Sequence, residues 1–198
     1  MRILLTGFEP FGHYKENSSW AVAEKVAACG FEGVSVTRLP VTFAGVAAAL
    51  RKAVDECRPD AIVMLGQSAV IDYVKLERVA INMMDSASAD NDGYLPDEEP
   101  IYPGGEAALF TNTKIKELCR AVKEQGLPAK VSNSAGLYVC NRLYYEALQL
   151  CKENHGMKAL FVHLPFYDGQ PSAPAGKSNM LLDDMAQAVN IIIHKIGQ

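Results

Sequence analysis

Short apolar runs alternate along this chain with segments whose apolar residues recur at helical spacing. The runs at 2–6, 61–65 and 159–163 are almost wholly apolar, which is typical of strands buried on both faces of a sheet. Segments such as 43–57 have the period of an amphipathic helix. Because a sheet buried on both faces needs helices on both sides, the alternation predicts an α/β fold, a three-layer α/β/α sandwich around a mostly parallel twisted sheet.

Loop-forming and helix-capping residues indicate where the expected elements begin and end. Two loops rich in Gly, Pro, Ser or Asp are expected at 85–105 and 169–178, and Ser18 or Ser19 is the expected cap of the first helix. No repeat or linker divides the chain, so we expect one domain over 1–198. The expected strands are 2–6, 34–39, 61–65, 74–84, 129–132 and 159–163, and the expected helices are 18–28, 43–57, 114–125, 140–154 and a last one ending near 196.

Charge and cysteine usage exclude several classes of function. The chain has 19 basic and 23 acidic residues and no basic stripe, which argues against nucleic-acid binding and against an anionic membrane surface. No apolar run is long enough for a signal peptide or a membrane span. The five cysteines are dispersed without a CxxC pair, so we expect no metal site and reduced thiols in a cytoplasmic protein.

Cys140 differs from the other four cysteines in its predicted position. It lies where the helix over 140–154 is expected to begin. A thiol at a helix N-terminus feels the positive end of the helix dipole, which favours the thiolate, and the unpaired amides of the first turn can donate to an oxyanion. Position alone also fits a small buried hydrophobe, so both interpretations of Cys140 stay open at this point.

A thiol nucleophile usually works with a histidine that a third group orients. Of the four histidines, His163 lies at the end of a predicted buried strand, which would hold its ring rigidly. Glu77 lies within the otherwise apolar segment 74–84, where an unpaired carboxylate would be costly to bury. His163 bonded to a backbone carbonyl and Glu77 as an exposed edge charge are the alternatives, and the spacing does not show that these residues meet.

Four segments in order along the chain carry a distinctive pattern. They are Leu5-Thr-Gly-Phe-Glu-Pro-Phe-Gly12, Glu77-Arg-Val-Ala-Ile-Asn82, Ser132-Asn-Ser-Ala-Gly-Leu-Tyr-Val-Cys-Asn141 and Phe161-Val-His-Leu-Pro-Phe166. These segments resemble the pyroglutamyl peptidase I (pyrrolidone-carboxylate peptidase) family along nearly the whole chain. The resemblance implies a cysteine peptidase that removes N-terminal pyroglutamate from peptides through a thioester, with Cys140 as nucleophile, His163 as base and Glu77 as the group that orients the histidine.

The resemblance also implies a substrate pocket and an assembly. A pyroglutamyl ring requires apolar walls and a few placed polar groups for its lactam. The family is expected to need no metal or cofactor and to form homotetramers. The pocket residues that the resemblance implies are Phe8, Phe11, Asn17, Gln67 and Val139.

The sequence departs from the family at two positions where arginine is usual. Ile71 stands at one of them and Ala87 at the other, and the second arginine is expected to help hold the oxyanion. Three interpretations follow: a slower pyroglutamyl peptidase that uses backbone amides, a substitute cation such as Arg142 or Lys75, or a thiol amidohydrolase with another acyl specificity. A protein that binds pyroglutamyl peptides without turnover is the alternative outside enzymes.

Overall fold

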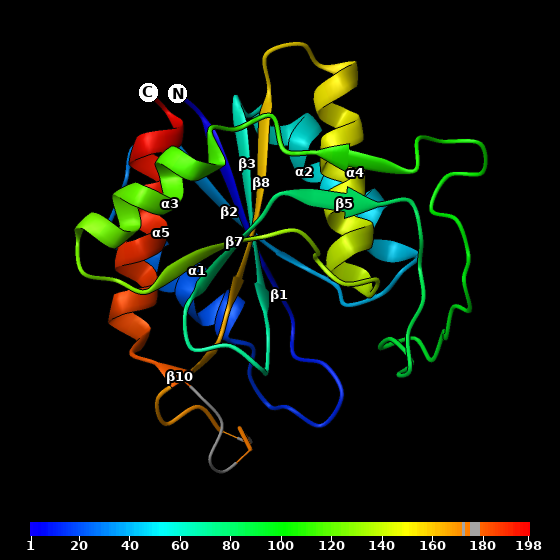
Figure 1. Ribbon diagram of the computed structural model, residues 1–198, viewed down its shortest axis with the longest axis horizontal. Coiled ribbons are helices and arrows are strands. Elements are labelled where there is room, and N and C mark those ends of the chain that lie inside the picture. Colours follow the sequence, from blue (N-terminus) through cyan, green and yellow to red (C-terminus); the bar gives the residue numbers. More distant parts are fainter. Residues whose placement is uncertain (172, 175–178) are drawn as a thin grey trace.

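A twisted central sheet organises the molecule (Figure 1). The structure, a computed structural model, describes residues 1–171, 173–174 and 179–198. Within these residues the sheet has six strands in the order β2-β1-β3-β8-β4-β7, and every neighbouring pair is parallel except β4 and β8. The strands are β1 (Ile3–Phe8), β2 (Val34–Leu39), β3 (Ala61–Gln67), β4 (Val74–Glu77), β7 (Ala129–Ser132) and β8 (Lys158–Leu164).

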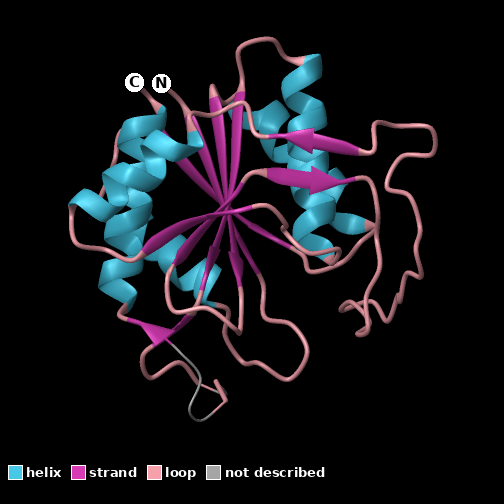
Figure 2. Ribbon diagram, viewed as in Figure 1, coloured by secondary structure: helices cyan, strands magenta, loops and turns pink. Residues whose placement is uncertain are grey.

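Helices cover both faces of this sheet, which confirms the predicted α/β architecture (Figure 2). One layer contains α1 (Ser18–Ala28), α3 (Ile115–Glu124) and α5 (Leu182–Ile196), in which α5 packs against both α1 and α3. The opposite layer contains α2 (Gly45–Cys57) and α4 (Val139–Glu153), which pack against each other.

Neighbouring residues of each central strand supply two separate hydrophobic cores. Leu4 and Phe161 belong to the core under α2 and α4, whereas Leu5 and Val162 belong to the core under α1, α3 and α5. All four side chains are fully buried. This alternation explains the unbroken apolar runs in the sequence, since both faces of each strand are covered.

The predicted strand over 74–84 is wrong as a single element. It divides at Arg78 into β4 and β5 (Val79–Ile81), and β5 pairs with β6 (Ala108–Phe110) in a second, antiparallel sheet. Arg78 makes the transition, because its amide donates to Ser132 of β7 while its carbonyl accepts from Thr111. Glu77 is therefore the last residue of the strand that stays in the central sheet.

Smaller differences concern the ends of elements. Asn17, not Ser18 or Ser19, caps α1, because its side chain accepts from the amide of Ser19. The pair β9 (Phe166–Tyr167) and β10 (Asn179–Met180) was not expected. Of the predicted loop 169–178, residues 172 and 175–178 lie outside the described residues. Among the described helices, none has the length and apolar character needed to cross a bilayer.

Candidate active site

The antiparallel pairing of β4 with β8 brings Glu77 and His163 into contact. Lys75 pairs with His163 and Glu77 pairs with Phe161, so these side chains share the face covered by α2 and α4. Nδ1 of His163 lies 2.8 Å from Oε1 of Glu77. Glu77 is fully buried and His163 is 6% exposed. Because a carboxylate can only accept, Nδ1–H donates to Glu77, and Nε2 keeps a lone pair that can take a proton.

Cys140 lies above the same region of the sheet. It is the second residue of α4, as the prediction of a helix N-terminus required. Gly66 of β3 pairs with His163, and a Cβ added to Gly66 would lie 3.1 Å from Sγ of Cys140 and 2.7 Å from the ring of Phe161. Glycine at position 66 therefore leaves the space that the thiol occupies beside the strand of His163.

The local environment opposes ionisation of both Cys140 and His163. Burial and the nearby Glu77 carboxylate raise the pKa of the Cys140 thiol to about 12, against a smaller opposite effect of Lys75. Burial also lowers the pKa of His163 from its ordinary value, although Glu77 acts in the opposite direction. The predicted position at the helix N-terminus is therefore right, and burial opposes the thiolate that the helix dipole favours.

A small cavity beside Cys140 is lined by all five residues that were predicted for the pocket. Phe8 ends β1, Val139 begins α4 and Asn17 caps α1. The Asn17 amide is already used, since Nδ2 donates to the carbonyl of Glu9 and Oδ1 accepts from Ser19. The described lining consists of Phe8, Phe11, Asn17, Val41, Gln67, Tyr138, Val139 and Cys140.

Gln67 holds an unused donor at this cavity. Its Oε1 accepts from the amide of Ser18 at 2.9 Å and from Nε2 of Gln170 at 2.7 Å. Since a backbone amide can only donate, these contacts fix which end of the Gln67 amide is oxygen. Nε2 of Gln67 is buried and has no hydrogen-bond partner in the described part of the chain. A buried donor without a partner is costly, so a ligand that accepts from Nε2 would be favoured.

Sequence reasoning missed Gln170, Val41 and Tyr138 as parts of the site. Gln170 is buried in the turn after β9, and nothing in its local pattern distinguishes it from other loop residues. Val41 and Tyr138 line the cavity, and Tyr138 also packs edge-on against Phe43. Their contribution follows only from the tertiary packing of three separate segments.

Comparison with known proteins identifies the family. The model described as pyroglutamyl peptidase matches residues 1–198. The chain belongs to the pyroglutamyl peptidase family. It is 40% identical over 200 residues to the pyrrolidone-carboxylate peptidase of Thermococcus kodakarensis, covering 99% of this chain and 96% of that protein. The corresponding enzyme of Clavibacter michiganensis is 37% identical, with 96% of this chain and 90% of that protein covered.

Solved structures of the pyroglutamyl peptidase family have the same fold. Pyroglutamyl peptidase I of Bacillus amyloliquefaciens superposes with a TM-score of 0.90 at 33% identity, covering 96% of this chain and 94% of that one. A mutant pyrrolidone carboxyl peptidase of Pyrococcus furiosus superposes with a TM-score of 0.92 at 31% identity, covering 99% and 98%. The predicted fold class is thereby confirmed.

The two departures from the family pattern have different surroundings. Ile71 is buried, whereas Ala87 is exposed on the long loop between β5 and β6. This loop lies against the residues that precede Cys140, because Tyr138 donates to the carbonyl of Ala89. Arg142, one of the suggested substitutes, donates instead to Glu146 at 2.7 Å. Lys75 remains as the cation beside the Glu77 and His163 pair.

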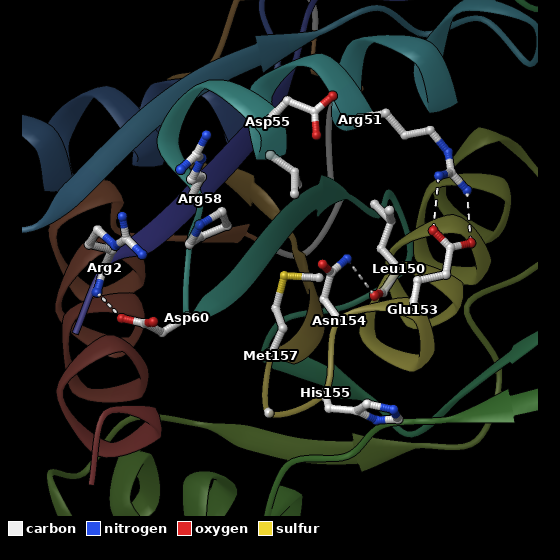
Figure 3. A pocket seen from close by; sticks show the side chains of 13 residues that line it. Arg2, Arg51, Asp55, Arg58, Asp60, Leu150, Glu153, Asn154, His155 and Met157 are labelled. Atoms are coloured by element: carbon white, nitrogen blue, oxygen red, sulfur yellow. Dashed lines mark hydrogen bonds and ion pairs between the residues drawn. The ribbon is translucent and has the colours of Figure 1, made fainter.

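A separate crevice lies at the opposite ends of the parallel strands from Cys140, beside Arg2 and Asp60, which precede β1 and β3 (Figure 3). Its volume is about 790 Å³. Arg51 pairs there with Glu153, and the amide of Arg2 donates to Asp60. None of the cysteines lines it. Its described charged residues are three arginines and three carboxylates, Arg2, Arg51, Arg58, Asp55, Asp60 and Glu153, so their formal charges cancel.

The described residues also contain no group of three or more His, Cys, Asp or Glu side chains arranged to hold a metal ion.

The ionisation of Cys140 can be tested by alkylation. Because its pKa is raised, we expect the rate of iodoacetamide labelling at Cys140 to keep increasing above roughly pH 8.5, where an ordinary thiol is half ionised. Mass spectrometry of the Cys140 peptide measures the rate, with exposed Cys29 as the internal reference for the reagent. A labelling rate that levels off below pH 7 would instead show a preformed thiolate.

Proposed function

We propose that this chain hydrolyses the amide bond that follows an N-terminal pyroglutamate in peptides. Cys140 is the nucleophile, His163 the general base and acid, and Glu77 the group that orients His163. The proposal rests on the surroundings of Cys140. The thiol borders a small cavity lined by Phe8 and Gln67, and the nearby strand β8 carries His163, which is hydrogen-bonded to the buried Glu77 carboxylate. Membership of the family supports the same activity.

The first chemical step starts from neutral groups. Nε2 of His163 accepts the thiol proton as Sγ of Cys140 attacks the carbonyl carbon that links pyroglutamate to the next residue. The Glu77 carboxylate stabilises the imidazolium that forms. The oxyanion faces the start of α4. The carbonyl of the cap, Tyr138, accepts from the amides of Asn141 and Arg142. The amides of the two helical residues before Asn141 are therefore placed to donate to the oxyanion.

The second step releases the products. The tetrahedral intermediate collapses to a thioester on Cys140 as His163 gives its proton to the leaving amine. His163 then removes a proton from water, which attacks the thioester and forms free pyroglutamate and the thiol. Each proton taken by His163 is returned, so the cycle requires no metal or cofactor.

The cavity favours a lactam over an ordinary N-terminus. Phe8, Phe11 and Val139 supply apolar walls for the ring methylenes. Nε2 of Gln67 is the buried donor for the lactam carbonyl. A charged α-amine would enter this apolar cavity without a counter-charge on its walls, since the lining has no acidic residue among the described ones. The binding partner is therefore a peptide whose first residue has been cyclised.

One alternative has a specific observation in its favour. Ala87 replaces the family's usual arginine on a loop that contacts Tyr138, next to the cavity. Loss of one oxyanion donor costs about 2.7–4 kcal/mol, or roughly 10²–10³ in rate. A thiol amidohydrolase with another acyl group would retain turnover but prefer a different blocked substrate. A protein that only binds pyroglutamyl peptides would show stoichiometric binding and no product.

The domain boundaries, the oligomeric state and the cellular compartment form part of the same proposal. We propose that residues 1–198 act as one domain, that the chain forms a homotetramer and that it works in the cytoplasm. Exposed apolar side chains support association, since Leu95 and Phe110 are 54% and 65% exposed. The five free cysteines support a reducing compartment. Light scattering measures the assembly state directly.

The activity is tested with purified protein and a pyroglutamyl-arylamide that releases a fluorophore. Replacing the nucleophile, Cys140→Ala, should lower turnover by a factor of about 10³ or more with the fold intact. Cys29→Ala is the matched control, because Cys29 is an exposed thiol remote from the cavity. Turnover by Cys140→Ala at the wild-type rate would reject the assignment. Activity on another blocked amide alone would favour the altered specificity.

The role of Gln67 is tested by Gln67→Glu, which removes the Nε2 donor and keeps the shape. We expect kcat/KM to fall roughly 5- to 150-fold, equivalent to about 1–3 kcal/mol for an unmade buried hydrogen bond. Gln125→Glu on the surface makes the same charge change and should have no effect. An unchanged kcat/KM for Gln67→Glu would show that the lactam carbonyl is bound elsewhere.

A further inference from the structure

Lys75 lies directly beside the proposed catalytic residues. In the antiparallel ladder it is the residue of β4 that faces His163, and it shares a face of the sheet with Glu77. Its Nζ lies 3.0 Å from Oε1 of Glu77, and its side chain is only 19% exposed. An ordinary surface lysine keeps its ammonium in water. Lys75 instead directs its ammonium toward a fully buried carboxylate.

The Glu77 carboxylate depends on this contact for its charge balance. Oε1 is shared between Nδ1 of His163 and Nζ of Lys75, while Oε2 is buried without a partner among the described residues. His163 is neutral near pH 7 and supplies a hydrogen bond but no charge. A buried carboxylate without a counter-ion is strongly disfavoured. In the described part of the chain, Lys75 is the one lysine or arginine within ion-pair distance of Glu77.

We propose that Lys75 is a positioning residue of this site, which holds Glu77 as an anion against Nδ1 of His163. The inference rests on the proposed function, because it assigns Lys75 a role in preparing His163 as a base. Lys75 acts through Glu77 and takes no proton from the substrate. Lys75 was considered as a substitute for the arginine that the family usually has at position 87. It contacts Glu77, the carboxylate that orients His163.

The charges around His163 determine what loss of Lys75 does. Strand β4 presents Lys75 and Glu77, helix α4 presents the Cys140 thiol and the Tyr144 hydroxyl, and β3 presents Gly66 without a charge. With Lys75 present, the buried set of lysine, carboxylate and neutral imidazole has no net charge. Without Lys75 it has a net negative charge, and His163 binds a proton at higher pH because the ammonium that lowers its pKa is gone.

The test is the pH dependence of kcat/KM for Lys75→Met. A proton held by His163 removes the base, so the acid limb of the profile should move to higher pH. At neutral pH kcat/KM should fall about 10- to 100-fold, by analogy with the loss of outer groups that orient metal-bound histidines. Lys75→Arg keeps the charge and should restore the position of the limb. Lys130→Met, one strand away over the ring of Tyr73, is the control of equal charge change.

A second readout separates this proposal from the proposed function. The ring resonances of His163, assigned by their absence from His163→Asn, give its titration by NMR without any substrate. The midpoint should move to higher pH in Lys75→Met and stay at the wild-type value in Lys130→Met. An unchanged midpoint and an unchanged acid limb would overturn the role of Lys75. A shifted midpoint in a protein without pyroglutamyl turnover would support Lys75 and reject the proposed activity.

Discussion

The site depends on the antiparallel pairing of β4 with β8. Every other neighbouring pair in the described central sheet is parallel, so β4 enters from the opposite direction. Its register places Lys75 and Glu77 beside His163 on the face covered by α4. A shift of one residue would turn both charged side chains toward the apolar core under α1, α3 and α5. The cost of burying them there explains why this register is strongly specified.

The environment keeps the reacting groups neutral until a substrate is present. Burial works against a thiolate at Cys140 and against an imidazolium at His163. An ion pair between them would have to overcome this burial, although Glu77 favours the charged imidazole. Substrate binding brings in an acyl carbon, which Sγ of Cys140 attacks as His163 takes the thiol proton. Glu77, with Lys75 beside it, then faces the positive charge that develops on the imidazole.

The central layers of the fold were predictable, because each central strand and helix has a distinct apolar period. The almost unbroken apolar runs over 61–65 and 159–163 required burial on both faces, and the cores under the two helix layers confirm it. The break at Arg78 was not predictable, since 74–84 is uniformly strand-like and only the hydrogen bonds to Ser132 and Thr111 separate its halves. The direction of β4 likewise depends on tertiary pairing.

The residues of the candidate site were predictable from the sequence, but their ionisation and several of their contacts were not. Motif resemblance selected Cys140, His163 and the five pocket residues, which the structure brings to one region. Ionisation was not predictable from the helix position of Cys140, because burial outweighs the dipole of α4. Gln170 contacts Gln67, which is distant in sequence, and the contact of Lys75 with Glu77 did not follow from its selection as a possible substitute cation. Their roles require the three-dimensional contacts.

The most direct measurement of the central claim is detection of the acyl-enzyme. Wild-type protein is mixed with an activated pyroglutamyl ester, quenched in acid within the first turnover, digested and analysed by mass spectrometry. The account predicts a pyroglutamyl group on the peptide that contains Cys140, labile to hydroxylamine as a thioester should be. Product release with no adduct on Cys140, or with the adduct on another residue, would contradict it.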